Sequence, residues 1–271
     1  MELDRYRPGF IVYTDKHALM TSDGTTTHLI AGNSTQEGYR EGVGAEARFY
    51  DIGGFTQILD KLVVVADSSN HCMRLIDRTT NNTSLLSGQC GESYGYENGR
   101  PGRLNRPWSV VIDQRNKSQL LITESWNAAV RTVDVKSQVV GTFKKHDSLL
   151  HIDCITQEKS GDLYVTAWFA VYRITYIQKT VSLISGSPGD IYGYRDSTLL
   201  DSRFDGPFEL ILIEPNTLLI SDSNNNKLRL VAMNSDKVAT LNVTNSLDDP
   251  RSLLLTNNSL YVGQSKKIFQ C

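Results

Sequence analysis

The sequence has no long apolar segment and little excess charge. No run approaches the roughly 18 consecutive apolar residues of a transmembrane helix, and the first residues lack the apolar stretch of a signal peptide. The net charge is −2 and the pI about 6.2, whereas proteins that hold nucleic acid by its phosphates usually show a basic excess. We therefore expect no membrane span and no nucleic-acid partner.

Motifs of common reactive sites are also missing. The chain has no Gly-x-Ser-x-Gly elbow, no phosphate-binding glycine loop and no His-Glu-x-x-His. It has only five histidines and four cysteines, and the cysteine spacing matches no zinc motif. These absences predict a non-enzymatic protein without a cofactor.

What the sequence does contain is a repeat. A short apolar run rich in Val, Ile, Leu and Tyr occurs six times, about 50 residues apart. Each run leads to one equivalent position, the anchor, which is occupied by Asp15, Asp67, Glu124, Thr166, Asp222 and Gln264. Short continuous runs predict strands buried on both faces, and this period without helical segments predicts the blades of a β-propeller.

The neighbours of the runs repeat as well. Arginines follow four anchors by seven residues, at Arg74, Arg131, Arg173 and Arg229. Gly-Tyr pairs recur in the connections at 38–39, 95–96 and 193–194, and an apolar residue follows each of them, at Phe49, Leu104 and Phe204. We expect each arginine to pair locally with acidic turn residues, for a modest gain in stability.

The segment Ala66–Asp77, Ala-Asp-Ser-Ser-Asn-His-Cys-Met-Arg-Leu-Ile-Asp, resembles the NHL repeat. The resemblance extends over nearly the whole chain and is weakest near Thr166, where Ala-Trp-Phe-Ala replaces the polar turn. Similarity to the NHL-repeat β-propeller family implies an all-β, six-bladed propeller of four-stranded antiparallel blades. It also implies one domain, residues 1–271, and family members mostly bind proteins, some of them RNA.

The two ends of the chain fall short of complete blades. Only one short strand fits before the first apolar run, and the chain stops inside the expected third strand of the last blade. Because closed propellers avoid exposed sheet edges, such a deficit needs an explanation, and the last blade is the one expected to be incomplete. Either the chain is a fragment of a larger protein, or the closing blade is irregular.

Two cysteines are placed to form a disulfide. Cys72 lies in a predicted third strand and Cys90 just past the fourth, and a hairpin centred on Asn81 and Asn82 would set them opposite each other. Such a bridge would contribute about 3 kcal/mol, and two buried free thiols are the alternative. Cys154 and Cys271 have no evident partner.

Six N-glycosylation sequons begin at Asn33, Asn81, Asn82, Asn116, Asn242 and Asn257. Most fall in predicted turns, although turns are also simply rich in Asn, Ser and Thr. Together with the disulfide they favour an extracellular or cell-surface protein. A cytoplasmic protein is the alternative.

The Asp-Ser-x-Asn turns contain oxygen ligands that calcium prefers. They occupy equivalent places in different blades, however, and lack the ligand density of a calcium loop. Asn and Asp bonding their own backbone in tight turns is the simpler interpretation.

One stretch gives a contrasting hypothesis. Residues 146–154 enter the blade anchored at Thr166, toward the expected central channel, where metal-using six-bladed enzymes of similar architecture place their ligands. His151 and Asp153, with Glu209, could then form the metal site of a hydrolase or lyase. The motifs of those enzymes are not repeated in this sequence.

Aromatic residues near turns are the candidate anchors for a protein partner. They are Trp108, Trp126, Trp168, Phe169, Tyr94, Tyr96, Tyr192 and Tyr194. Trp126 and Trp168 hold the same repeat position, so packing roles are at least as good an interpretation for these two. The sequence predicts a binding propeller that recognises a protein through loops on one face of the ring, and it identifies neither the partner nor the oligomeric state.

Overall fold

The computed structural model describes residues 1–59, 61–91, 94–189, 191–214, 216–244, 246–264 and 268–270. Residue contacts divide the chain into two compact units, Met1–Lys145 and His146–Cys271, here called unit 1 and unit 2. The single domain expected over residues 1–271 stays a prediction. Helical structure in the described ranges consists of three-residue 3₁₀ turns, at Gly44–Glu46, Ser68–Asn70, Ser125–Asn127, Asp147–Leu149 and Met233–Ser235.

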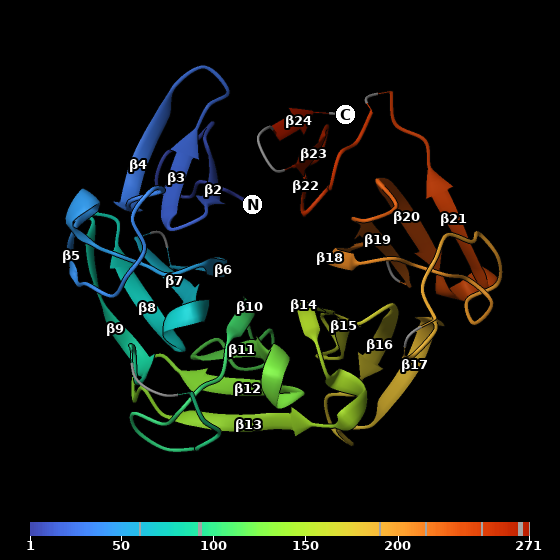
Figure 1. The fold of residues 1–271 in the computed structure, drawn as a ribbon, viewed down its shortest axis with the longest axis horizontal. Coiled ribbons are helices and arrows are strands. Elements are labelled where there is room, and N and C mark those ends of the chain that lie inside the picture. Colours follow the sequence, from blue (N-terminus) through green and yellow to red (C-terminus); the bar gives the residue numbers. More distant parts are fainter. Residues whose placement is uncertain are drawn as a thin grey trace. The chain divides into compact units, whose positions relative to one another are not determined.

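Unit 1 contains three antiparallel sheets that follow one another along the chain (Figure 1). The first has the order β1-β2-β3-β4, with strands Glu2–Leu3, Ile11–Asp15, Ala18–Ser22 and Thr27–Gly32. The second has the order β5-β9-β8-β7-β6, with strands Gly42–Val43, Asn82–Gly88, Cys72–Asp77, Leu62–Asp67 and Ile52–Ile58. The third has the order β10-β11-β12-β13, with strands Pro107–Ile112, Gln119–Glu124, Ala129–Asp134 and Val140–Lys145.

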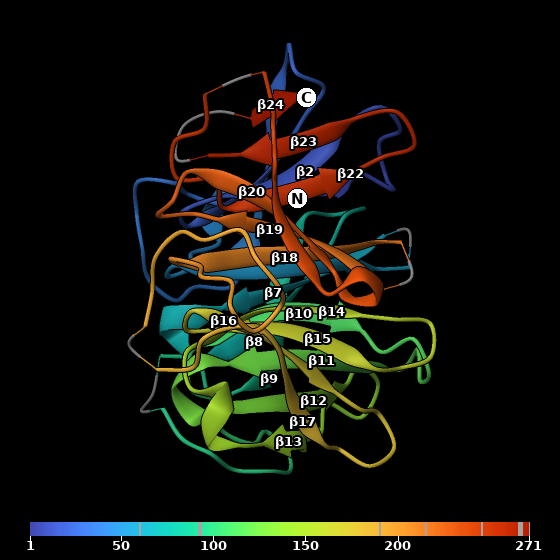
Figure 2. The same ribbon diagram turned by 90° about the vertical axis from the view of Figure 1, so that its right-hand side faces the viewer.

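Unit 2 also contains three antiparallel sheets. The first has the order β14-β15-β16-β17, with strands Ile152–Gln157, Leu163–Ala167, Ala170–Ile174 and Val181–Gly186. The second has the order β18-β19-β20-β21, with strands Pro207–Glu214, Thr217–Asp222, Lys227–Ala232 and Lys237–Leu241; β18, β19 and β20 lie side by side in Figure 2. The third has the order β22-β23-β24, with strands Ser252–Leu255, Leu260–Gly263 and Ile268–Gln270.

The predicted fold class, an all-β six-bladed propeller, is confirmed. Every apolar run of the repeat forms the second strand of its sheet, namely β2, β7, β11, β15, β19 and β23. All six have neighbours on both sides, and β7, β11, β15 and β19 are also covered on both faces, which explains their continuous apolar character, whereas β2 and β23 are only partly buried. The blades differ from a uniform four strands in two places, because β5 adds to the edge of β9 and the last blade has three strands.

The hydrophobic core lies between successive sheets of a unit. The apolar residues that follow the Gly-Tyr pairs are buried there, Phe49 between the first two sheets, Leu104 between the next two and Phe204 in unit 2. Fully burying a side chain of this size stabilises the fold by about 1.5–3 kcal/mol. The repeat of these residues is therefore a packing signal.

Each four-stranded meander has two distinct ends. The turn after the second strand and the connection to the next sheet lie at the same end, because neighbouring strands run in opposite directions. We call it the anchor end, since the anchors stand there. The turns after the first and third strands lie at the other end.

Candidate functional site

Three of the four in-phase arginines are fully buried beside their anchors. The N–O distances are 3.0 Å for Arg74–Asp67, 2.8 Å for Arg131–Glu124 and 2.7 Å for Arg229–Asp222, with all six side chains 0% exposed. The expected local pairing with an acidic residue is present, but these three pairs are buried, and removing one partner of a buried pair costs about 3–5 kcal/mol. The anchor Thr166 has no carboxylate, and Arg173 pairs with the partly exposed Asp162 instead.

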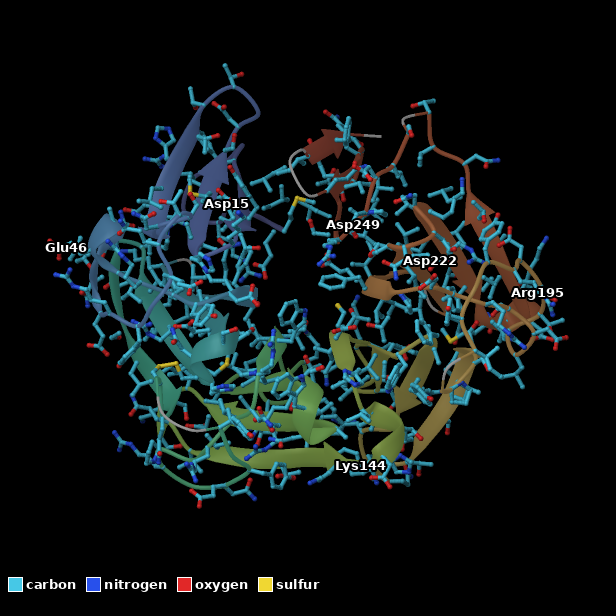
Figure 3. All side chains as sticks on the ribbon, viewed as in Figure 1. Asp15, Glu46, Lys144, Arg195, Asp222 and Asp249 are labelled. Carbon is cyan, nitrogen blue, oxygen red and sulfur yellow. A yellow bond between two sulfur atoms is a disulfide. The ribbon has the colours of Figure 1, made fainter. Side chains whose placement is uncertain are left out.

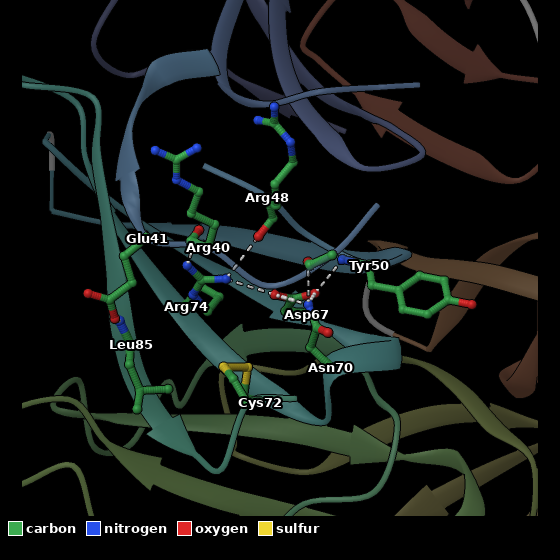
Figure 4. The surroundings of a disulfide bond; sticks show 11 residues. Arg40, Glu41, Arg48, Tyr50, Asp67, Asn70, Cys72, Arg74 and Leu85 are labelled. Carbon is green, nitrogen blue, oxygen red and sulfur yellow. Dashed lines mark hydrogen bonds and ion pairs between the residues drawn. A yellow bond between two sulfur atoms is a disulfide. The ribbon is translucent and has the colours of Figure 1, made fainter. Parts of the chain in front are cut away.

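The buried pairs hold the connections at the anchor end. In the second sheet, the Asp67 carboxylate accepts hydrogen bonds from Asn70 Nδ2 at 2.9 Å and from the backbone N–H of Tyr50 at 2.8 Å (Figure 4). Arg74 Nη2 donates to the Arg40 carbonyl at 2.9 Å. Equivalent contacts recur around Glu124, Asn127 and Arg131 and around Asp222, Asn225 and Arg229.

This network also explains the Asp-Ser-x-Asn turns. Asn70 donates to the Asp67 side chain and to the Gly38 carbonyl of the connection, rather than to the backbone of its own turn as expected. Burial raises the pKa of Asp67 to about 6 and also raises the pKa of Glu124 and of Asp222, which stands at the end of β19 (Figure 3). Each of them accepts hydrogen bonds from the arginine and the asparagine beside it and so serves as a structural acceptor.

The tyrosines of the Gly-Tyr pairs pack on the same guanidinium groups. The ring centroids of Tyr39, Tyr96 and Tyr194 lie 4.8, 4.3 and 5.0 Å from Arg74, Arg131 and Arg229. The hydroxyls of Tyr96 and Tyr194 bond those of Thr142 and Thr240. Tyr96 and Tyr194, expected as partner anchors, thus have a structural role.

A disulfide joins Cys72 to Cys90, the pair that the sequence indicated. The predicted hairpin centre is wrong, because the turn after β8 ends at Asn81 and Asn82 already belongs to β9. Cys72 therefore lies opposite Gly88, and Cys90 reaches it from beyond the strand. A Cβ at Gly88 would lie 3.1 Å from the Cys72 Cα, so glycine provides the room for this close approach.

Exposed aromatic side chains of unit 1 gather at the anchor end around Arg106. Its guanidinium lies 5.1 Å from the centroid of the Trp126 ring and 3.4 Å from Asp51. Tyr94 makes an edge contact with Trp126 at 6.4 Å and lies 5.6 Å from the His71 ring. We call these five residues the Trp126 patch; Trp126 is 51% and Tyr94 57% exposed.

Backbone geometry fixes this patch. Arg106 stands directly before β10 with φ +49°, and its N–H donates to His71 Nδ1 at 3.1 Å. Trp126 sits on the 3₁₀ turn that follows the anchor Glu124. Trp, Tyr and Arg are the residue types enriched in the energetic centres of protein interfaces. The arrangement can therefore offer a partner a rigid aromatic surface with one cation.

Unit 2 carries a second aromatic group at its anchor end. The rings of His151 and Trp168 lie 4.4 Å apart, those of Trp168 and Phe169 5.8 Å, and those of Phe169 and Tyr192 5.2 Å. Phe169–Tyr192 repeats the contact of His71–Tyr94, because each pair joins the residue before the third strand to the residue two before the tyrosine of the Gly-Tyr pair. This pairing was not predicted from the sequence, although Phe169 and Tyr192 hold the same positions in the repeat as His71 and Tyr94.

The proposed ligands His151, Asp153 and Glu209 are not assembled as a set. His151 is exposed against Trp168, while Glu209 accepts a hydrogen bond from the backbone N–H of Leu253 at 2.7 Å. Burial raises the pKa of Asp153 to about 7, against the opposing charge of Arg251.

Among the described residues, one trio of His, Cys, Asp or Glu has its ligand atoms within 4.8 Å of one another, namely Asp67, Cys72 and Cys90. Its sulfurs are joined in the disulfide and its carboxylate is paired with Arg74. Cys154 is buried, takes no part in the disulfide, and its thiol lies near the carbonyls of Ile155 and Leu210; Cys271 lies outside the described residues.

The sequons differ in their surroundings. Asn33, Asn116, Asn242 and Asn257 lie in connections outside the strands, Asn81 ends a turn and Asn82 begins β9.

Nowhere in the described ranges is a helix long and apolar enough to cross a membrane.

No protein-family model matches the chain. NHL repeat-containing protein 2 of Bos taurus is 28% identical over 133 residues, which cover 45% of this chain and 18% of the relative. Protein SUPPRESSOR OF QUENCHING 1, chloroplastic, of Arabidopsis thaliana is 33% identical over 90 residues, 32% of this chain and 8% of the relative. The chain thus spans less than a fifth of the length of either relative.

Solved structures share the fold at low identity. An auxiliary nutrient binding protein from Bacteroides ovatus matches all of this chain and 68% of its own, at 13% identity and a TM-score of 0.73. A chain from a nidogen/laminin complex matches over 93% of this chain and 84% of its own length, at 11% sequence identity and a TM-score of 0.65. A streptogramin B lyase matches over 81% of this chain and 64% of its own length, at 14% sequence identity and a TM-score of 0.56. With the repeat motifs, these similarities fit an NHL-repeat β-propeller.

Proposed function

We propose that the chain is a non-enzymatic binding propeller that recognises a protein partner through the Trp126 patch, in an extracellular or cell-surface setting. The observation that carries this proposal is the pair of half-exposed aromatic rings, Trp126 and Tyr94, which contact each other, with the guanidinium of Arg106 over the Trp126 ring. The names of two structures of the same fold, a nutrient binding protein and a nidogen/laminin complex, are compatible with a binding role.

The patch suits this role because its side chains already contact one another. The stacking of Arg106 on Trp126 and the hydrogen bond from its N–H to His71 fix the surface before a partner arrives. Ordering a free side chain on binding costs about 0.5–1.5 kcal/mol. A preformed surface avoids much of that cost, so more of the contact energy contributes to affinity.

The extracellular setting is supported by the Cys72–Cys90 disulfide, because disulfides persist in oxidising compartments. A cytoplasmic protein is the alternative, and one distant relative is named as chloroplastic. Intact mass of the protein from its natural source, with and without reduction, tests the setting. A reduced pair in the natural protein would contradict it.

The binding role is tested by comparing three proteins as baits: the wild type, Trp126→Ala and Leu59→Ala. Leu59 is 73% exposed and stands in the turn between β6 and β7, at the end opposite the patch, so it is a matched control. A true partner, once purified, binds the wild type and Leu59→Ala with equal affinity. It binds Trp126→Ala at least about 30-fold more weakly, as truncation of an interface centre does. Equal binding to all three would reject the patch.

A second candidate is a hydrolase or lyase that uses Asp153. The pKa of about 7 gives this carboxyl the protonation range of a general acid or base, and a streptogramin B lyase has the same fold. Elemental analysis of purified protein tests the metal-dependent form. Stoichiometric metal that is lost in His151→Ala supports it, and metal-free wild-type protein rejects it.

A further inference from the structure

The structure separates the six sequons by the local geometry of their side chains. We infer that Asn33 and Asn116 are acceptors of N-linked glycans and that Asn81 and Asn82 are not. This inference rests on the extracellular part of the proposed function and is independent of the Trp126 patch.

Asn33 and Asn116 each form a compact turn of the same kind. The Asn33 Oδ1 accepts the Thr35 backbone N–H at 3.0 Å and its hydroxyl at 2.9 Å. The Asn116 Oδ1 accepts the Ser118 N–H at 3.3 Å and its hydroxyl at 2.9 Å. The asparagine and the hydroxyl residue of each sequon are thus joined directly, in two separate connections of unit 1.

Both turns need no distant partner for these contacts. Asn and Ser/Thr side chains make such bonds over two residues, so the turn can form in a nascent chain before any sheet exists. Both sequons also stay accessible after folding: Asn116 and Ser118 are exposed, and Asn33 is half-buried with Thr35 exposed. A glycan on either asparagine therefore conflicts neither with the early chain nor with the finished fold.

Asn81 and Asn82 have a different environment. The carbonyl of Asn81 accepts the Gly44 N–H at 3.0 Å, and the side chain of Thr83, its sequon hydroxyl residue, is fully buried. Asn82 lies in β9 between two strands, opposite Asp77 of β8 and Val43 of β5. The partners Val43 and Gly44 stand some 40 residues earlier in the chain; since the Asn82 side chain itself is exposed, the inference for this pair rests on the buried Thr83 and on the pairing of β9 with β5.

The remaining two sequons are outside the inference. The Ser259 hydroxyl, which belongs to the Asn257 sequon, accepts a hydrogen bond from Gln270 Nε2 at 2.8 Å. Asn242 lies close to residue 245, which is not among the described residues.

The modification requires a lipid-linked oligosaccharide diphosphate as co-substrate. The Asn Nδ2 forms a bond to C1 of the first sugar, the bond from C1 to the diphosphate oxygen breaks, and the lipid diphosphate leaves while the amide loses one proton. The chain supplies only the acceptor amide and its turn.

The experiment is glycopeptide mapping of the full chain, secreted from a eukaryotic host by a cleavable leader peptide. Formation of the Cys72–Cys90 disulfide, read by mass before and after reduction, confirms that the secreted protein is folded. We expect glycans at Asn33 and Asn116, loss of one glycan in each of Asn33→Asp and Asn116→Asp, and no change in the double variant Asn81→Asp/Asn82→Asp. Asn→Asp keeps the turn acceptor Oδ1 and removes the amide.

The matched control is Thr35→Ser, which keeps the hydroxyl and the glycan, against Thr35→Ala, which loses both. An oxidised secreted chain with unmodified Asn33 and Asn116, or with glycans at Asn81 or Asn82, would overturn the inference. Partner binding is measured separately on enzymatically deglycosylated protein. Failure of that binding bears on the patch alone.

Discussion

The backbone N–H of Arg106, directly before β10, donates to Nδ1 of His71, directly before β8. The same link joins Asp51 N–H to His17 Nδ1 at 2.9 Å. In unit 2 the acceptor is an asparagine, since Asp249 N–H donates to Asn226 Oδ1 at 2.7 Å. Where this link forms, the side chain before the third strand supplies the acceptor, and histidine can do so only while Nδ1 carries no proton.

The link predicts a pH-dependent stability at His71. Burial and the nearby Arg106 charge lower its pKa below the usual 6.5, so the folded state favours the neutral ring. The stabilisation is present above about pH 6.5 and is lost as pH falls through the lowered pKa. We expect His71→Asn, which copies Asn226, to flatten the change in unfolding midpoint between pH 7.5 and 5, measured by circular dichroism.

His71→Ala is the comparison for that experiment. It removes the acceptor at every pH and should cost about 1–2 kcal/mol at pH 7.5. Asp67 changes stability in the opposite sense, because its raised pKa makes its contribution disappear as pH rises through about 6. All three proteins retain Asp67, so the differences between them report on His71. Parallel pH profiles for wild type and His71→Asn would contradict the prediction.

The buried pair Glu124–Arg131 should be strongly coupled. Glu124→Gln leaves the fully buried Arg131 guanidinium without its charge partner, and we expect a loss of about 3–5 kcal/mol in the free energy of unfolding. The double variant Glu124→Gln/Arg131→Met should lose less than the sum of the single variants, in a denaturant-unfolding cycle. Asp162→Asn, in the partly exposed pair with Arg173, should cost no more than about 1 kcal/mol. Equal losses at both pairs would show that burial does not matter here.

The repeat made the fold and this pairing partly predictable. Continuous apolar runs identified the second strand of every sheet, and the seven-residue spacing aligned Arg74, Arg131 and Arg229. The spacing does not reveal burial, because the acid and the arginine are covered by connections from residues some 30 positions earlier, such as the Arg40 carbonyl above Arg74. The cost of removing one partner could therefore not be predicted from the spacing.

The candidate surface was harder to predict for the same reason. Trp126, Tyr94 and Arg106 belong to three separate segments, which meet only after two sheets pack and His71 fixes the connection. The cysteine pair was found from approximate hairpin symmetry, although the true register places Gly88 opposite Cys72. The predicted pair was nevertheless correct, because Cys90 lies beyond the end of β9, where the chain can bend back toward Cys72.

Opening the disulfide should loosen the connection that carries Tyr94. Chain-entropy estimates for a bridge with a sequence separation of 18 give about 3 kcal/mol. We expect Cys72→Ala/Cys90→Ala to lower the free energy of unfolding by about 2–4 kcal/mol and to speed amide exchange at Gly91, whose N–H donates to the Asn70 carbonyl. A reducing agent should reproduce both effects in the wild type and change nothing in the double variant. Unchanged exchange at Gly91 would argue against this local role.

The titration of Asp153 should appear as a stability that falls with rising pH. Burial raises its folded pKa to about 7, far above the usual value of 3.8, so the folded state holds a proton that the unfolded chain has released. The contribution is complete below about pH 4 and is lost as pH rises through 7, with a slope of about 1.4 kcal/mol per pH unit between 5 and 7. Asp153→Asn imitates the protonated form, so its denaturant midpoint should change less over this range and exceed that of the wild type at pH 8. Carboxyl ¹³C NMR of the wild type should show the same transition near pH 7. A transition near 4, with no gain from the asparagine, would mean that the folded protein stabilises the charged carboxylate, and the general-acid candidate would lose its basis.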